Sequence, residues 1–251
     1  MSLFRDLKSA VAFLTIIPVS ESSATVQEVA LSAYLFPAVG AVLGLIIGLL
    51  GSVLMVFLPG LTSAVLVVGG LYFSTGLHHF DGLLDFGDGL MFRGTPELKV
   101  TVMRDKATGA GGLALGLINT LLLVSCLWTV LADNLLPLML VSETSAKLAM
   151  VFAAFIGKPS SEGVGAVFTG SMKGRRGRAA LTGAIVFSVV IAVVALRIRG
   201  LVGSVSALVI AGSLVMLSHR HFQSVTGDVL GAVNELARSC TLLILVVFRW
   251  L

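Results

Sequence analysis

Long apolar stretches, most of them close to the length of a membrane span, determine what this chain can fold into. A helix needs about 20 apolar residues to cross a bilayer. Such stretches cover residues 30–57, 61–77, 111–132, 135–157, 180–198, 201–217 and, over a shorter length, 238–251. Only 12% of the residues are charged, against about 25% in soluble domains. We therefore expect an all-α fold, a polytopic integral membrane helical bundle of about 6–7 transmembrane helices in a single domain over residues 1–251.

The N-terminal residues follow a different pattern. Residues 1–18 carry Arg5, Asp6 and Lys8 among regularly spaced apolar residues. This pattern predicts an amphipathic helix that lies on the membrane face.

Basic residues gather in three connecting segments, residues 78–110, 158–179 and 218–238. The positive-inside rule places such segments in the cytoplasm. Arg197 and Arg199 are exceptions, because they lie in a short loop that is expected on the other side of the membrane. We expect a multi-pass protein of the cell membrane whose site faces the cytoplasm. The net charge of +4 follows from this bias and does not require binding to nucleic acid. The expected partner is the lipid bilayer.

Three carboxylates lie close together in the first of these segments. Asp81, Asp85 and Asp88 fall within roughly 60° of one another on a helix, and His78 lies on the same face. Like charges crowded beside a membrane are costly unless a cation neutralises them. Mg²⁺ is the natural candidate, because it takes a few carboxylates together with substrate phosphate oxygens. The alternative is a solvated, negatively charged helix end.

A second group follows at the next helix start. Asp105 lies between Arg104 and Lys106, and a glycine-rich run from Gly109 opens the next apolar stretch. Free backbone N–H groups at a helix start suit phosphate. Asp105 is expected to complete a metal site while the two basic residues hold diphosphate oxygens. This motif alone is a weak indication of phosphate binding, because glycine at the start of a span more often allows close packing of helices.

The other two basic segments hold further candidates. Glu162 precedes a basic run over residues 173–178, which is read as an anchor at anionic lipid. Asp228 and Glu235 are seven residues apart and share a helical face with Gly231. Ionisable residues in an apolar segment are functional candidates, and an inter-helix salt bridge is the alternative.

At this point the sequence resembles a known family. Residues 79–89, HFDGLLDFGDG, resemble the His-x-Asp-Gly-Leu-x-Asp-x-x-Asp-Gly signature of the cobalamin (5′-phosphate) synthase family, the adenosylcobinamide-GDP ribazoletransferases. Residues 13–18, 103–112, 162–165 and 227–236 are similar to the other motifs of that family in the same order. Ile16, Phe80 and Ala107 depart from the residues usual there.

The resemblance implies a reaction and a set of residues. α-Ribazole, or its 5′-phosphate, is joined to adenosylcobinamide-GDP, GMP leaves, and adenosylcobalamin or its 5′-phosphate forms, with Mg²⁺ as the cofactor. The implied catalytic residues are His79, Asp81, Asp85, Asp88 and Asp105, and the four aspartates are also the implied metal ligands. The implied substrate-binding residues are Arg104, Lys106, Gly109, Glu162, Asp228 and Glu235. Whether an acid or His79 takes the hydroxyl proton stays open, as does a homo-oligomeric state.

Two other classes of function remain as alternatives. A cation-coupled transporter would use the inward acids as an ion site, but transporters place such acids near the midplane and carry an internal repeat. A CDP-alcohol phosphotransferase also uses spaced aspartates at the membrane face. The spacing of the aspartates here differs from the motif of that family.

Overall fold

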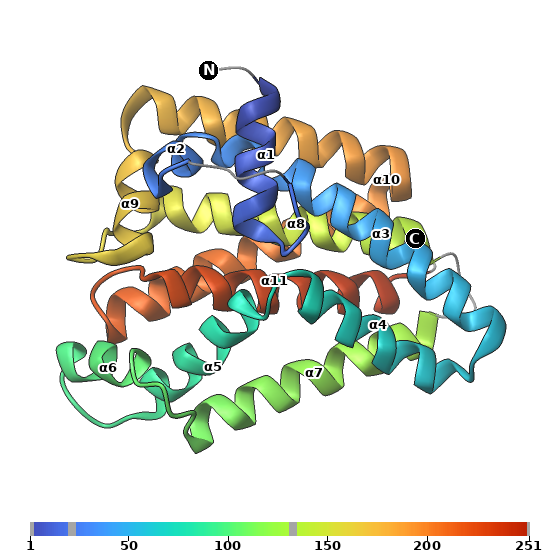
Figure 1. Cartoon of the computed structure of the whole chain (residues 1–251), viewed down its shortest axis with the longest axis horizontal. Coiled ribbons are helices and arrows are strands. Elements are labelled where there is room, and N and C mark those ends of the chain that lie inside the picture. Colours follow the sequence, from blue (N-terminus) through green and yellow to red (C-terminus); the bar gives the residue numbers. More distant parts are fainter. Residues whose placement is uncertain (1–2, 20–23, 131–134, 250–251) are drawn as a thin grey trace.

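The computed structural model describes residues 3–19, 24–130 and 135–249, in which helices are joined by turns and short connections and there is no β-strand (Figure 1). The elements are α1 (Leu3–Leu14), α2 (Val26–Leu31), a 3₁₀ turn (Ala33–Leu35), α3 (Phe36–Phe57), α4 (Gly60–Ser74), α5 (His78–Met91), α6 (Pro96–Met103), α7 (Ala110–Val130), α8 (Leu135–Ile156), α9 (Gly163–Ser171), α10 (Gly174–His221) and α11 (Gly227–Val247). The expected all-α fold is confirmed.

Five of the described helical segments are long and apolar enough to cross a membrane: Ala33–Phe57, α7, α8, α10 and α11. Helices α4 and α5 pass the same test only as a pair, and they are bent by 93° at the break between them. Counting that pair gives up to 6 spans by length and composition, with α10 counted as one. The expectation of a multi-pass helical membrane protein is confirmed.

Helix α10 contains a sharp kink. Arg197 has φ 52° and ψ −132°, which no helix accommodates. A side chain added at Gly200 would collide with the carbonyl oxygen of Ala192, although residues eight apart in a straight helix are about 12 Å apart. The chain therefore doubles back here, where the sequence predicts the boundary between spans 180–198 and 201–217.

Arg199 in this bend gives a physical reason for one departure from the positive-inside rule. Its Nε donates to the carbonyl oxygen of Leu245 at 2.8 Å. Leu245 lies in the last turn of α11, where carbonyl groups lack helical partners and a cation is favourable. Lys173 makes a similar contact, because its Nζ donates to the carbonyl oxygen of Gly157 just beyond α8. Lys173 therefore fixes a helix end as well as belonging to the predicted lipid anchor.

Two span boundaries predicted from the sequence were wrong. The first predicted span begins at residue 30, but α2 extends to Leu31 and the span begins at Ala33. The last predicted span covers 238–251, but α11 begins at Gly227, after a cap in which Thr226 accepts the N–H of Val229. Polar residues in the first half of α11 hid this helix in the sequence. Three other parts of the predicted cytoplasmic segments also form helices, namely α5, α6 and α9.

Helix α8 forms the centre of the bundle. Every residue from Val141 to Val151 is buried, and α8 packs against α3, α10 and α11. Helix α11 in turn packs against α5 and α7, so it lies between α8 and the carboxylate helix (Figure 1). The central pair α8 and α11 thereby fixes the position of α5.

Candidate active site

The carboxylate helix α5 leaves α4 through a tight turn. Gly76 and Leu77 both have positive φ, 60° and 62°, and the ring Nδ1 of His78 lies 3.0 Å from the carbonyl oxygen of Thr75. This turn produces the 93° bend. At the far end, buried Lys99 of α6 contacts the carbonyl oxygens of Gly89 and Leu90 at 3.2 and 3.1 Å. Both ends of α5 are therefore fixed.

Glycines of the α5 signature allow two neighbouring helices to approach closely. A Cβ at Gly82 would lie 3.0 Å from both Cα and the carbonyl oxygen of Asp228 in α11. A Cβ at Gly87 would lie 2.9 Å from the carbonyl oxygen of Gly111 in α7. These contacts leave no room for a side chain, so the two glycines position the aspartates between them.

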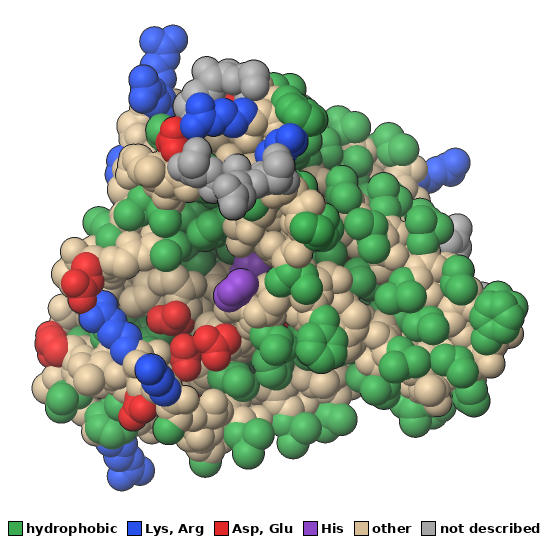
Figure 2. Space-filling model, in the orientation of Figure 1, with side chains coloured by type: hydrophobic (Ala, Val, Ile, Leu, Met, Phe, Trp, Pro, Cys, Tyr) green, Lys and Arg blue, Asp and Glu red, His purple; other side chains and the backbone are tan. Residues whose placement is uncertain are grey.

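The α5 aspartates lie on one helical face, as predicted, and the structure adds a fourth acid. Asp81 is exposed, and Asp85 and Asp88 are partly buried. Asp85 interacts electrostatically with Asp81, Asp88 and, across the α5–α11 contact, Asp228. The hydroxyl of Thr226 contacts Oδ2 of Asp228 at 3.2 Å. Figure 2 shows acidic side chains gathered beside histidine, with basic side chains close by.

Asp88 has a further role that the sequence did not reveal. Its Oδ2 accepts the N–H of Gly109 at 2.7 Å, and its Oδ1 accepts the N–H of Gly112 at 2.8 Å. The carboxylate thus caps the start of α7. The N–H of Gly109 was expected to face a phosphate, but in this structure Asp88 occupies it. The helix-start amides at Gly109 and Gly112 are therefore not free for an anion.

The predicted metal ligands do not converge on one point. Among the described residues, no group of three or more His, Cys, Asp or Glu side chains is placed to hold a metal ion. Asp105 instead accepts the N–H of Ala107 within its own loop, at 3.1 Å. A preassembled metal cage over Asp81, Asp85, Asp88 and Asp105 therefore does not fit. The accessible carboxylates do fit magnesium held by one or two carboxylates plus substrate phosphate oxygens.

Two predicted substrate-binding residues contact each other. Arg104, at the end of α6, and Glu162, just before α9, form an ion pair of 2.6 Å with side chains 50% and 67% exposed. Arg104 also interacts electrostatically with Asp228, so it lies at the edge of the acidic cluster. Lys106 is exposed on the same loop.

An apolar cavity of about 360 Å³ adjoins the acidic cluster. Phe13, Phe36 and Phe168 line one part of it, and the ionisable residues among its described lining are His78, His79 and Asp228. His79 is only 7% exposed, and its Nδ1 is buried without a hydrogen-bond partner. The cavity therefore combines an apolar wall with a polar end that shares Asp228 with the carboxylate site.

Glu235 differs from its predicted role. It is completely buried and is not among the residues that line the cavity. Its Oε2 lies 2.5 Å from Arg238, and Arg238 also pairs with Glu143 of α8. Glu235 therefore forms a salt bridge within α11, and the inter-helix salt bridge is the one between Arg238 and Glu143.

The sequence reasoning missed the rest of this buried network. Lys147 lies 3.5 Å from Glu143 and donates to Oδ1 of Asn234 at 2.8 Å. Lys147, Glu143, Asn234 and Arg238 are all 0% exposed. The available signal was a Glu and a Lys at i and i+4 inside an otherwise apolar stretch, since ionisable residues at membrane depth are functional candidates.

Fold and site together define a polytopic helical membrane protein whose acidic cluster adjoins an apolar cavity. The chain belongs to the cobalamin-5-phosphate synthase family, because the model of that family matches residues 6–246.

Relatives extend over nearly the whole chain. An adenosylcobinamide-GDP ribazoletransferase of Methanocella arvoryzae is 35% identical and covers 100% of this chain and 98% of its own length. The proteins of that name from Methanococcoides burtonii and Thermococcus kodakarensis are 34% and 32% identical, over 96% and 97% of this chain and 91% and 99% of their own. No solved structure matches.

Proposed function

We propose that this chain is a membrane transferase that joins α-ribazole, or its 5′-phosphate, to adenosylcobinamide-GDP and releases GMP. The observation that carries the proposal is the acidic cluster of α5 and α11 at the polar end of an apolar cavity. Membership of the family over residues 6–246 and the names of the relatives support it. The product is adenosylcobalamin or its 5′-phosphate.

The proposed reaction is a displacement at phosphorus. A hydroxyl oxygen of the ribazole attacks the phosphate that is joined to cobinamide, and a new P–O bond forms. The bond from this phosphorus to the oxygen of the GMP phosphate breaks, and GMP leaves with the electron pair. Such reactions depend mainly on positioning and on neutralisation of charge.

The hydroxyl proton needs an acceptor near the cavity. His79 lines the cavity, and its buried Nδ1 has no hydrogen-bond partner. We favour the His79 imidazole over the α5 carboxylates as the acceptor, because His79 lines the cavity and a general base must reach the proton that it abstracts. Asp228 lines the same end of the cavity and is proposed to orient the hydroxyl.

Magnesium is proposed to be held by Asp81 and Asp85 together with the substrate. These two side chains are the more available acids of α5, since both Asp88 oxygens already accept backbone N–H groups. Bound there, the ion would neutralise charge on the diphosphate. Arg104 and Lys106, both exposed at the edge of the cluster, are proposed to bind phosphate oxygens, with Glu162 orienting Arg104.

Release of GMP tests the proposed function. Purified protein in detergent is supplied with adenosylcobinamide-GDP, α-ribazole and Mg²⁺, and GMP is measured by chromatography. We expect GMP only when both substrates are present, and a corrinoid product in equal amount. Absence of GMP with active-site variants and wild type alike would favour the transporter alternative.

The site is proposed to face the cytoplasm of the cell. In a background without Cys126 and Cys240, single cysteines at Thr95, Ser171 and Ser224 should react with a membrane-impermeant maleimide only from the cytoplasmic side. These residues lie beside α6, at the end of α9 and before α11. A cysteine at Asn134, which lies outside the described residues, should react only from the other side. Labelling of the Ser171 position from outside would contradict this orientation.

A further inference from the structure

The apolar part of the cavity is built from aromatic rings of three separate helices. Phe13 of α1 lies 5.3 Å from Phe168 of α9 and 6.2 Å from Phe36 of α3, measured between ring centroids. Phe36 and Phe168 are 5.6 Å apart. Met150 and Val151 of α8 complete this wall. Such a surface favours a flat, apolar ligand, because aromatic faces gain from stacking as well as from burial.

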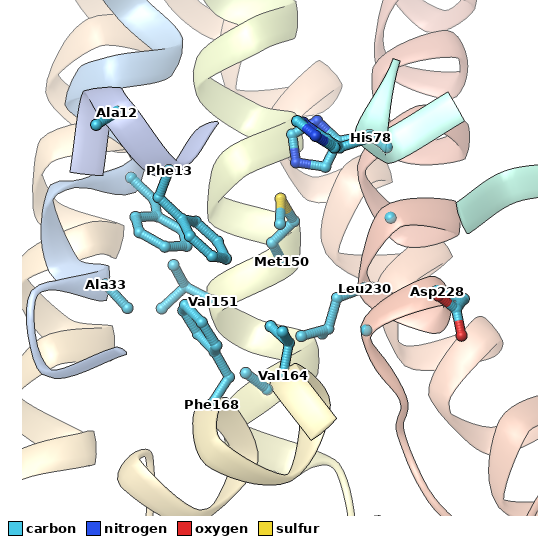
Figure 3. A pocket seen from close by; sticks show the side chains of 15 residues that line it. Ala12, Phe13, Ala33, His78, Met150, Val151, Val164, Phe168, Asp228 and Leu230 are labelled. Carbon is cyan, nitrogen blue, oxygen red and sulfur yellow. The ribbon is translucent and has the colours of Figure 1, made fainter. Parts of the chain in front are cut away.

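The opposite end of the cavity is polar and is shared with the carboxylate site. Figure 3 shows Phe13 and Phe168 on one side of the cavity and His78 and Asp228 on the other. No lysine or arginine is among the described lining residues, so the lining has no cation to hold the phosphates of a nucleotide. Its volume of about 360 Å³ lies at the small end of the range of about 300–1,000 Å³ for ligand pockets, which suits a nucleoside better than a corrinoid macrocycle.

We propose that this cavity is the binding site for the benzimidazole-type base of the ribazole substrate. The base packs against this wall at Phe13, the one of the three rings that is only partly buried, and its ribose lies at the polar end beside His79 and Asp228. Asp228 lines this end of the cavity and interacts electrostatically with Asp85, so this placement directs the sugar toward the α5 carboxylates. The inference rests on the proposed function. It specifies which substrate binds in the cavity and which part of that substrate the cavity surrounds.

Val164 offers a way to narrow the cavity without disturbing the core. It lines the cavity from the first turn of α9 and is 39% exposed. We expect Val164→Trp to raise the KM for α-ribazole about tenfold or more, since a misfit of even one methylene group in an apolar pocket costs about 10–200-fold. The KM for adenosylcobinamide-GDP and the melting temperature should stay near wild type. Gly170→Trp is the matched control, because Gly170 is exposed on the same helix with open space around it.

The preference for base size is a second measurement, and a purely structural effect of the substitution would leave it unchanged. Ribosides of unsubstituted and of ring-methylated benzimidazole are compared as substrates and, by equilibrium dialysis without the second substrate, as ligands. Val164→Trp should shift preference toward the smaller base in both assays, and Gly170→Trp should not. Because binding is measured without turnover, this arm decides the inference even if wild type releases no GMP.

Three results would overturn the assignment. The first is a Val164→Trp protein in which only the KM for adenosylcobinamide-GDP is raised, which would show that the corrinoid substrate binds in the cavity. The second is phospholipid that copurifies with wild type and is lost in Val164→Trp while ribazole binding is unchanged, which would make the cavity a lipid site. The third is equal binding of both ribosides to wild type and Val164→Trp.

Discussion

Asp81→Asn and Asp85→Asn are expected to lower turnover by about 10²–10³-fold while the protein inserts and folds normally. Asp81 is exposed and Asp85 only partly buried, so neither amide leaves a fully buried group without a partner. The loss arises because the acids are proposed to hold the cation that neutralises the diphosphate. GMP release at varied Mg²⁺ concentration, measured with the melting temperature of the same sample, checks the prediction.

Glu97→Gln is the matched control for these variants. Glu97 is an exposed carboxylate in the first turn of α6, so the same change in charge occurs close by but outside the cluster. Its turnover should equal that of wild type. An Asp81→Asn protein with near-normal activity at low Mg²⁺ would remove Asp81 from the proposed site.

Asp88→Asn should behave differently from its two neighbours. Both of its oxygens accept N–H groups at the start of α7, and an amide can accept only at one of them. We therefore expect a loss of stability of about 1 kcal/mol, typical of a lost cap, together with the loss of turnover. A melting temperature equal to that of Asp81→Asn would show that the cap contributes nothing.

The sequence predicted those features that depend on local pattern. The lengths of the apolar stretches predicted the bounds of α7 and α8 to within a few residues. Helical periodicity placed Asp81, Asp85 and Asp88 on one face. The break near Arg197 was also predicted, from two apolar stretches separated by basic residues. Each of these depends on residues that are close together in the chain.

The features that the sequence did not predict depend on contacts between distant residues. Asp88 caps a helix that begins more than 20 residues later, and Arg104 pairs with Glu162 from another segment. The start of α11 was missed because Asn234 and Arg238 interrupt the apolar pattern, and their partners Lys147 and Glu143 lie on α8. A prediction from hydropathy assumes that polar residues are exposed, whereas the polar residues of α8 and α11 are buried and contact one another.

Arg238→Met is expected to cause the largest loss of stability, about 3–5 kcal/mol, because it leaves buried carboxylates without their partner. Arg238 pairs with Glu143 and Glu235, and Lys147 is the second cation beside Glu143. All four side chains are buried in α8 and α11, and two acids and two bases balance. Thermal unfolding in detergent and the yield of folded protein measure the effect.

Two double variants separate electrostatic balance from simple loss of volume. Arg238→Met with Glu235→Met removes one acid and one base and leaves Glu143 paired with Lys147, so it should recover most of the stability lost in Arg238→Met. Arg238→Met with Lys147→Met changes the same number of residues but leaves two carboxylates without a cation, so it should be less stable than the single variant. Equal stability of the two double variants would show that these four residues do not act as a balanced network. The expected order instead means that the network holds α11 against α8, and through α11 keeps Asp228 in place beside α5.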